Sequence, residues 1–337
     1  MRQAIVIASF GAMGDDSRER CLDALEADFR AEFPEAVIVQ AFTSTFIRTS
    51  LEKRGLHVDS LEEALLRLSE EDVTHVLVQP TYMTPGEEYE KKVLDVVPAY
   101  TSRYEKLTVG EPAFFEEADY TRNLIALCRS IFVPRDAELV LLGHGSPHRH
   151  NPVYERLQAE IDAQQLPIHV GVLESTDTPD FKMVLERLQK RQVREVLLAP
   201  LLLTSGMHVA RDMAGEGEAS WKARLEKAGF SVTPIFEGLG EANSTSRRRE
   251  GRCAQSASRM PLLIENNESK AAPVQITWMG LPFFEPVSLR RCETPVDSDS
   301  LRRYHENKKI FAFVVILERI GYHVRRIFAM KNGIFFG

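Results

Sequence analysis

Three side chains that could hold a metal ion follow strand-like segments in the second part of the chain. His144 ends the run VLLGH and lies between Gly143 and Gly145, Glu174 ends GVLE, and His208 follows LLLTSGM. Two imidazoles and a carboxylate suit Co²⁺, Fe²⁺, Ni²⁺ or Zn²⁺, and the absence of thiolates favours an ion that is released again. Three protein ligands leave coordination positions open for a reacting group. The pattern therefore predicts a site that passes a metal on rather than a structural one.

Each of these residues alone also has an ordinary structural explanation. His144 could cap the helix that follows its strand, and Glu174 competes with Asp177 and Asp180 for the cap of the next helix. His208 could be a solvent-facing residue in a first helical turn. The metal-site hypothesis depends on all three residues following strands of the same domain, which is much less expected by accident.

The surroundings of these residues occur twice in the chain. VTHVLVQPTYMTPG at 73–86 and VREVLLAPLLLTSG at 193–206 are identical at six positions in register. The alignment extends outward and places His144 over Phe10, Glu174 over Thr43 and His208 over Glu88. The last two pairs lie at the ends of equivalent strands or loops. The chain thus reads as one unit used twice, with metal-capable groups concentrated in the second copy.

Strand and helix patterns alternate in both copies. Short β-branched runs predict strands buried on both faces of a parallel sheet, at 4–10, 36–42, 75–80, 138–144, 168–175, 194–200 and 232–236. Helical patterns lie at 16–32, 44–53, 60–70, 87–100, 117–132, 152–164, 179–190 and 217–228. Ser60 with Glu63 forms a capping-box pattern at the start of one of them.

This alternation predicts an α/β fold of two Rossmann-like, doubly wound parallel-sheet halves with a cleft between them. We expect an N-terminal half at 1–132, a C-terminal half with the metal ligands at 133–243, and an atypical tail at 244–337. Ligands of open parallel sheets bind beyond the carboxyl ends of the strands. His144, Glu174, His208 and Glu88 are all expected at such ends.

The tail differs from the rest of the chain in charge. Residues 1–243 carry 26 Lys and Arg against 40 Asp and Glu, whereas residues 244–337 carry 16 against 9. An acidic body argues against nucleic acid as a partner. The tail has three interpretations: a disordered, frameshift-derived ending, which we favour, a small added domain, or a basic surface-binding segment.

Several classes of protein are disfavoured by missing signals. Neither GxGxxG nor GxxxxGK[ST] occurs, and GHGS is not a GxSxG elbow. We see no signal peptide and no apolar run long enough to span a membrane, so a cytoplasmic protein is expected. We interpret His148 and His150 as exposed residues near the mouth of the cleft, and His57, His75 and His169 as surface residues.

Several stretches of the chain resemble a known family. IVIASFG near the start, QAFTSTFIR at 40–48, PGEEYEK at 85–91, LLGHGSPH at 141–148 and the long block at 204–230, TSGMHVARDMAGEGEASWKARLEKAGF, are similar to the anaerobic, class II cobalt chelatases, which are related to ferrochelatase. The resemblance covers about residues 1–241, and its last block is the most specific. After Glu241 the pattern stops, where a final amphipathic helix would be expected.

The resemblance implies ATP-independent insertion of Co²⁺ into sirohydrochlorin in anaerobic cobalamin biosynthesis. It implies metal binding by His144, Glu174 and His208, with Glu88 supporting His144 in catalysis. No permanently bound cofactor is expected, because Co²⁺ is a substrate. The candidates for binding the substrate carboxylates are Ser9, Phe10, Gly11, Arg48 and Arg211.

Alternatives remain open within and beyond this chemistry. A His/Glu/His set does not distinguish Co²⁺ from Fe²⁺, so a siroheme-type iron chelatase is the nearest alternative, and a nickel chelatase is weaker. A non-catalytic tetrapyrrole or metal carrier is the alternative from another class. The expected partners are a sirohydrochlorin-type tetrapyrrole and a divalent ion, with neither nucleic acid nor membrane, and a homo-oligomer is an open expectation.

Overall fold

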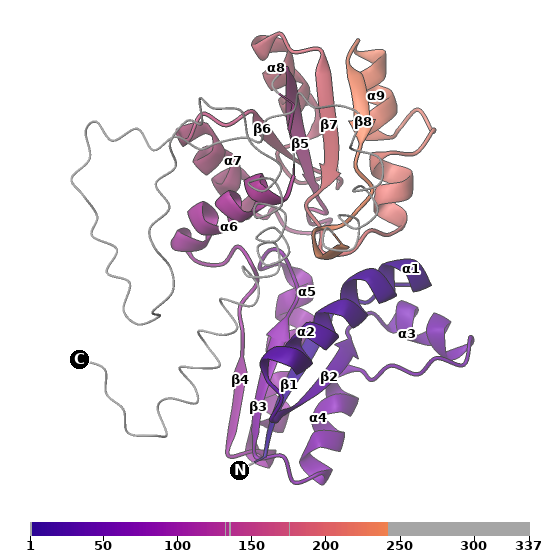
Figure 1. Cartoon of the computed structure of the whole chain (residues 1–337), viewed down its shortest axis with the longest axis vertical. Coiled ribbons are helices and arrows are strands. Elements are labelled where there is room, and N and C mark those ends of the chain that lie inside the picture. Colours follow the sequence, from indigo (N-terminus) through magenta and orange to yellow (C-terminus); the bar gives the residue numbers. More distant parts are fainter. Residues whose placement is uncertain (1, 132, 135, 175, 242–337) are drawn as a thin grey trace, which may run out of the picture.

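The computed structural model describes residues 2–131, 133–134, 136–174 and 176–241. The expectations for the tail at 244–337 therefore lie outside the described residues. The described chain forms two parallel sheets, each with helices on both faces (Figure 1). Within the described ranges, no helix is long and apolar enough to cross a membrane.

The N-terminal half contains a four-stranded sheet in the order β2-β1-β3-β4. Its strands are β1 (Gln3–Ser9), β2 (Ala36–Phe42), β3 (His75–Pro80) and β4 (Lys106–Val109). Its helical segments are α1 (Asp15–Ser17), η1 (Arg18–Asp23), α2 (Ala24–Glu32), α3 (Thr45–Glu52), α4 (Leu61–Glu70), α5 (Glu87–Tyr89), η2 (Glu90–Leu94) and η3 (Val97–Arg103).

The C-terminal half repeats this topology with the order β6-β5-β7-β8. Its strands are β5 (Ala137–Gly143), β6 (Ile168–Val172), β7 (Glu195–Pro200) and β8 (Ser231–Pro234). The remaining helical segments are α6 (Glu117–Ser130), α7 (Val153–Ala163), α8 (Phe181–Arg191), η4 (His208–Met213), α9 (Trp221–Lys227) and η5 (Leu239–Glu241). The predicted pair of doubly wound parallel sheets is confirmed.

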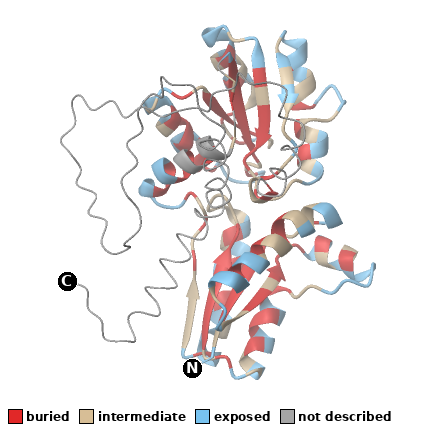
Figure 2. Ribbon diagram, in the orientation of Figure 1, coloured by how far each residue is buried: buried red, intermediate tan, exposed pale blue. Residues whose placement is uncertain are grey.

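The central strands are buried on both faces because helices cover both (Figure 2). All seven residues of β5 and all six of β3 are buried. The apolar runs of the sequence are therefore explained by position in the sheet. The predicted capping box is also present: Ser60 accepts from the Glu63 backbone, and the Glu63 side chain accepts from the Ser60 backbone.

The internal repeat extends to the backbone hydrogen bonds, which correct the sequence alignment by one residue. Glu174 N–H donates to the carbonyl of His144, and Ser44 N–H donates to the carbonyl of Phe10. His144 is thus equivalent to Phe10, as predicted. However, Glu174 is equivalent to Ser44, not to Thr43. The alignment slipped because the loop sequences after β2 and β6 offer few shared residues to fix the register.

Some predicted elements are divided or were missed. The helix expected at 16–32 is a run of three segments with the π-helical η1 in its middle. The helix expected at 87–100 is likewise divided into α5, η2 and η3. β4 was not predicted, because its four residues are only half-buried and carry no apolar run.

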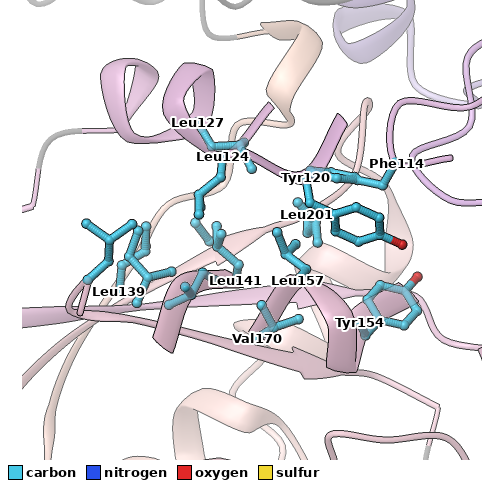
Figure 3. Close-up of a cluster of buried hydrophobic side chains, with 14 of the residues drawn as sticks. Phe114, Tyr120, Leu124, Leu127, Leu139, Leu141, Tyr154, Leu157, Val170 and Leu201 are labelled. Carbon is cyan, nitrogen blue, oxygen red and sulfur yellow. The ribbon is translucent and has the colours of Figure 1, made fainter. Parts of the chain in front are cut away.

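One helix packs on the half that follows it in the sequence. α6 lies on the N-terminal side of the expected boundary at 132. Its side chains Tyr120, Leu124 and Leu127 nevertheless pack with Leu139 and Leu157 of the C-terminal half (Figure 3). The chain therefore passes from one half to the other before α6.

Two histidines expected on the surface are buried. His75 begins β3 and is 6% exposed, and His169 in β6 is 1% exposed. His169 Nε2 hydrogen bonds to the buried carboxylate of Glu138 in the neighbouring strand, and its Nδ1 accepts from Arg187. A polar partner of this kind is what allows a histidine to occupy a sheet interior. His57 is exposed, as predicted.

Candidate active site

His144 and His208 are brought together at the carboxyl ends of neighbouring strands. His144 follows β5 directly, and His208 opens η4 after the loop that leaves β7. These two strands are adjacent in the sheet, where the chain order reverses between β5 and its neighbours. Such a reversal is where open α/β sheets bind ligands. The predicted placement of both residues at one sheet edge is correct.

The two imidazoles face each other through the same ring atom. His144 Nε2 lies 3.3 Å from His208 Nε2, and the rings meet edge to face with centroids 4.5 Å apart. In neutral rings, one Nε2–H can donate to the other Nε2. Two nitrogen ligands at about 2.0–2.1 Å from one metal ion, at a tetrahedral angle, lie about 3.3–3.4 Å apart. The observed separation therefore suits two ligands of a single ion.

Asp212 orients the ring of His208. His208 Nδ1 lies 2.7 Å from Asp212 Oδ2, and Arg211 Nε donates to Asp212 Oδ1 at 2.7 Å. The hydrogen bond from Arg211, with smaller contributions from His208, holds the pKa of the Asp212 carboxyl below its usual range. A carboxylate on Nδ1 fixes the proton there and leaves the Nε2 lone pair for a metal ion.

Glu174 is joined to His144 through the backbone rather than through its carboxylate. Its N–H donates to the His144 carbonyl at 3.0 Å. Throughout the described ranges, no three His, Cys, Asp or Glu side chains are close enough together to hold one metal ion. The structure thus brings together the two histidines but not the carboxylate of Glu174. Its role as third ligand stays a prediction.

Gly145 lets the chain turn directly after His144, close to the side chain of Glu174. Its φ of +79° lies in the left-handed region that favours glycine. A Cβ at this position would lie 3.1 Å from the Cβ atoms of both Glu174 and Val172. The equivalent Gly11 has φ +100°, and its Cβ would lie 2.7 Å from the ring of Phe42. Both halves therefore require glycine at the second residue after the end of the first strand.

Glu88 lies at the position in the N-terminal half that His208 has in the C-terminal half. It is exposed in α5, and its charge acts on Tyr82. The Tyr82 hydroxyl lies 2.6 Å from Thr43 Oγ1. Burial of this phenol, and to a lesser degree Glu88, raises the Tyr82 pKa, so it stays protonated at neutral pH. Glu88 therefore acts through its charge on a polar pair, Tyr82 and Thr43, that sequence patterns did not indicate.

The residues proposed for substrate binding differ in how available they are. Phe10 is 48% exposed at the end of β1, whereas Ser9 is buried and its hydroxyl has no hydrogen-bond partner among the described residues. Arg48 lies 3.5 Å from Glu63, which anchors one end of its guanidinium at the start of α4. Arg211 is largely exposed and pairs with Asp212, so it lies beside the histidine pair.

An exposed methionine adds apolar surface beside the histidines. Met207 directly precedes His208 and is 67% exposed. Together with Phe10, it offers an apolar side chain in a loop that leaves a carboxyl strand end. Exposed large apolar side chains at a sheet edge suit contact with the face of a planar ligand.

Comparison with known proteins identifies the family of the chain. The family model described as cobalt chelatase (CbiK) matches residues 3–247. The chain belongs to the cobalt chelatase (CbiK) family. The match includes every site residue named above and ends four residues into the tail expected at 244–337, so most of the tail lies beyond it.

Two relatives of this family are similar over most of their length. The sirohydrochlorin cobaltochelatase of Salmonella typhimurium is 34% identical over 246 residues, which are 72% of this chain and 91% of the relative. The sirohydrochlorin cobaltochelatase CbiKC of Nitratidesulfovibrio vulgaris is 33% identical over 243 residues, 71% of this chain and 85% of the relative. Among solved structures, SirB from Bacillus subtilis with Fe³⁺ aligns with a TM-score of 0.49 at 17% identity, covering 75% of this chain and 96% of SirB.

Sequence reasoning missed the residues that hold the site in place. Asp212 lies four residues after His208, a spacing that brings side chains together on a helix and could have indicated the pair. Asp177 was considered only as a helix cap, but Asp180 caps α8 instead. Asp177 is buried and accepts hydrogen bonds from the backbone of Ser146 and Asn151 in the loop after His144. No local sequence pattern distinguishes Asp177 from Asp180.

Proposed function

We propose that this protein inserts Co²⁺ into sirohydrochlorin without ATP. The observation that carries the proposal is the pair of imidazole Nε2 atoms 3.3 Å apart at the carboxyl ends of β5 and β7. Family membership and the names of the two relatives support cobalt and sirohydrochlorin as the substrates. Metal and macrocycle are both substrates, and no resident cofactor is needed.

The histidines can receive the ion and then give it up. Imidazole nitrogens bind Co²⁺, but a site with no thiolate among its proposed ligands and with open positions does not trap the ion. Asp212 keeps the Nε2 lone pair of His208 directed toward His144. We assign His144 and His208 as the first ligands and Glu174 as a ligand that completes the set when its carboxylate turns toward them.

The reaction must also remove two protons from the macrocycle. Each of two pyrrole nitrogens loses its N–H proton and uses the freed electron pair to bind Co²⁺, so two protons leave for each ion inserted. A neutral imidazole accepts a proton near neutral pH, which suits His144 once it releases the ion. Glu88 is the proposed second acceptor, from the opposite half. Ser9, Phe10, Gly11, Arg48 and Arg211 remain the proposed contacts for the macrocycle and its carboxylates.

An anaerobic insertion assay tests the proposal. The full-length protein would be mixed with sirohydrochlorin and Co²⁺, and separately with Fe²⁺ or Ni²⁺, while the absorbance of the macrocycle is followed against a protein-free control. Acceleration that is greatest with Co²⁺ supports the proposed function. Faster insertion of Fe²⁺ would identify an iron chelatase. Tight binding of the macrocycle without any acceleration would identify a carrier and overturn the proposal.

A further inference from the structure

The two loops that lead to Glu88 and His208 are each held by the opposite half of the molecule. The first loop leaves β3 and runs through Thr84 and Pro85 to α5. The second leaves β7 and runs through Ser205 to η4. Neither loop is held only by its own sheet.

Asn151 of the C-terminal half contacts the first loop. Its Nδ2 donates to the Pro85 carbonyl at 3.3 Å and to Thr84 Oγ1 at 3.2 Å. Its Oδ1 accepts from the Val153 backbone at 3.2 Å. Every polar atom of this amide is thus engaged, and the side chain is buried. The contact links the start of α7, which follows the His144 loop, to the loop that carries Glu88.

Ser17 of the N-terminal half contacts the second loop. Its hydroxyl donates to the Ser205 carbonyl at 2.9 Å and lies 3.4 Å from Ser205 Oγ. Nearby, the Cys21 thiol donates to the Leu203 carbonyl at 3.5 Å. This contact links the start of η1, which follows the Phe10 loop, to the loop that carries His208.

The two contacts are equivalent under the internal repeat. Asn151 follows β5 at the same distance as Ser17 follows β1, because Gly143 and Ser9 are equivalent strand ends. Pro85 and Ser205 likewise follow the equivalent residues Pro80 and Pro200 by the same number of residues. In each half, the backbone carbonyl at the same loop position is therefore held by the equivalent helix start of the opposite half. The side chains that bind the two carbonyls differ.

A buried carboxylate holds one partner in each contact: the anchor Asn151 in the first and the anchored residue Ser205 in the second. Asp177 is fully buried and accepts from the Asn151 backbone at 3.1 Å and from the Ser146 backbone at 2.9 Å. In the second contact, Glu241 is buried, accepts from the Ser205 backbone at 2.7 Å and lies 3.4 Å from Arg20. Neither contact is a loose surface bond, so each can transmit position.

We propose that Asn151 and Ser17 are positioning residues with different tasks, an inference that rests on the proposed function. Asn151 fixes Glu88 of one half relative to His144 of the other, and so controls turnover after the metal is bound. Ser17 fixes the loop that presents His208 to His144, and so controls affinity for the ion. Neither residue touches the metal or the macrocycle.

The test compares Asn151→Ser with Ser17→Ala in the full-length protein. Serine at 151 keeps an oxygen to cap Val153 but cannot reach the opposite loop. We expect kcat for Co²⁺ insertion to fall roughly tenfold, with the KM for sirohydrochlorin and the affinity for Co²⁺ alone within about twofold of wild type. Ser17→Ala should instead weaken binding of Co²⁺ alone by roughly tenfold, and Ser17→Thr should restore it.

A double-mutant cycle and a matched control complete the experiment. In a Glu88→Gln background, Asn151→Ser should add less than about a twofold loss. Thr121→Ala is the control, since it removes an exposed side-chain hydrogen bond to Glu160 away from both loops. Equal effects of Asn151→Ser and Ser17→Ala on both quantities, or additive losses in the cycle, would overturn the inference. If wild type shows no insertion, the proposed function fails. The Co²⁺ affinity of Ser17→Ala then still tests whether the contact of Ser17 with Ser205 positions His208.

Discussion

His208 and Glu88 occupy equivalent positions in the two halves, each in the first helical turn after an equivalent loop. The backbone shows the equivalence directly, because Ala210 N–H donates to Gly206 and Glu90 N–H donates to Gly86 at 3.1 and 3.0 Å. One copy of the repeat therefore carries an imidazole where the other carries a carboxylate. His144 and Phe10 differ in the same way. Under the proposed function, this asymmetry gives the C-terminal half both nitrogen ligands and gives the N-terminal half Glu88 as a second proton acceptor.

Removing the carboxylate that orients His208 should weaken metal binding. Asp212→Asn leaves an amide that can present either an oxygen or a nitrogen to Nδ1, so the lone pair on Nε2 is no longer fixed. We expect affinity for Co²⁺ to fall by about 10- to 100-fold. The measurement is a titration with Co²⁺ alone, followed by its visible absorption bands. Asp16→Asn, at an exposed carboxylate in the other half, is the control. Unchanged affinity in Asp212→Asn would show that His208 needs no such partner.

A methyl group at Gly145 should disturb the turn between His144 and Glu174. Gly145→Ala has to adopt φ near +79° and places its Cβ about 3.1 Å from two other Cβ atoms. Gly55 has φ +77° with open space around it, so Gly55→Ala carries the backbone cost alone.

We expect Gly55→Ala to lower the free energy of unfolding by about 1 kcal/mol and Gly145→Ala by about 2–3 kcal/mol. Urea denaturation of both variants measures the difference. Equal losses would mean that the loop yields without strain, and the close approach to Glu174 would then have no energetic consequence.

The buried hydrogen bond of Glu138 with His169 and its ion pair with Arg191 should make stability depend on pH. Burial raises the pKa of this carboxyl, but hydrogen bonds from His169 and Arg191 outweigh burial, and the pKa lies below its usual range. A lowered pKa contributes stability that is present above the unfolded pKa and is lost as the pH falls through the folded pKa.

Glu138→Gln should therefore cost about 2 kcal/mol of unfolding free energy at pH 7, and this cost should shrink below about pH 4. Urea denaturation at several pH values measures both. Glu195→Gln, at an exposed position of the adjacent strand β7, should show neither effect. A cost of Glu138→Gln that is the same at both ends of the pH range would contradict the ion-pair explanation.

The fold was predictable because its signals are local and repeated. Apolar runs such as HVLVQP mark strands buried on both faces, and the Ser60 and Glu63 pair marks a helix start. β4 was missed because an edge strand with four half-buried residues has no such run. The half on which α6 packs could not be predicted from its own sequence, because an apolar helix face does not indicate which sheet it covers.

The meeting of His144 and His208 was predictable, but the residues that support them were not. His144 and His208 each follow a strand, and parallel topology brings strand ends together. The sequence pairs Glu174 with Thr43, whereas the backbone hydrogen bonds pair it with Ser44. The hydrogen bonds that the backbone donates to the buried Asp177 are equally absent from any sequence spacing. The contacts of Asn151 and Ser17 join residues far apart in the sequence, so only the folded chain reveals them.

The rate of Co²⁺ insertion by His144→Ala shows whether the paired imidazoles take part in the reaction. Wild type and His144→Ala would be compared with His57→Ala, which removes an exposed histidine paired with Glu52 and Asp59 in the other half. We predict that His144→Ala lowers the rate of insertion by at least about 100-fold, while its thermal unfolding and that of His57→Ala stay near wild type and His57→Ala inserts Co²⁺ normally. A His144→Ala protein that is folded and inserts Co²⁺ at the wild-type rate would contradict the account, because the paired imidazoles would then have no part in the reaction.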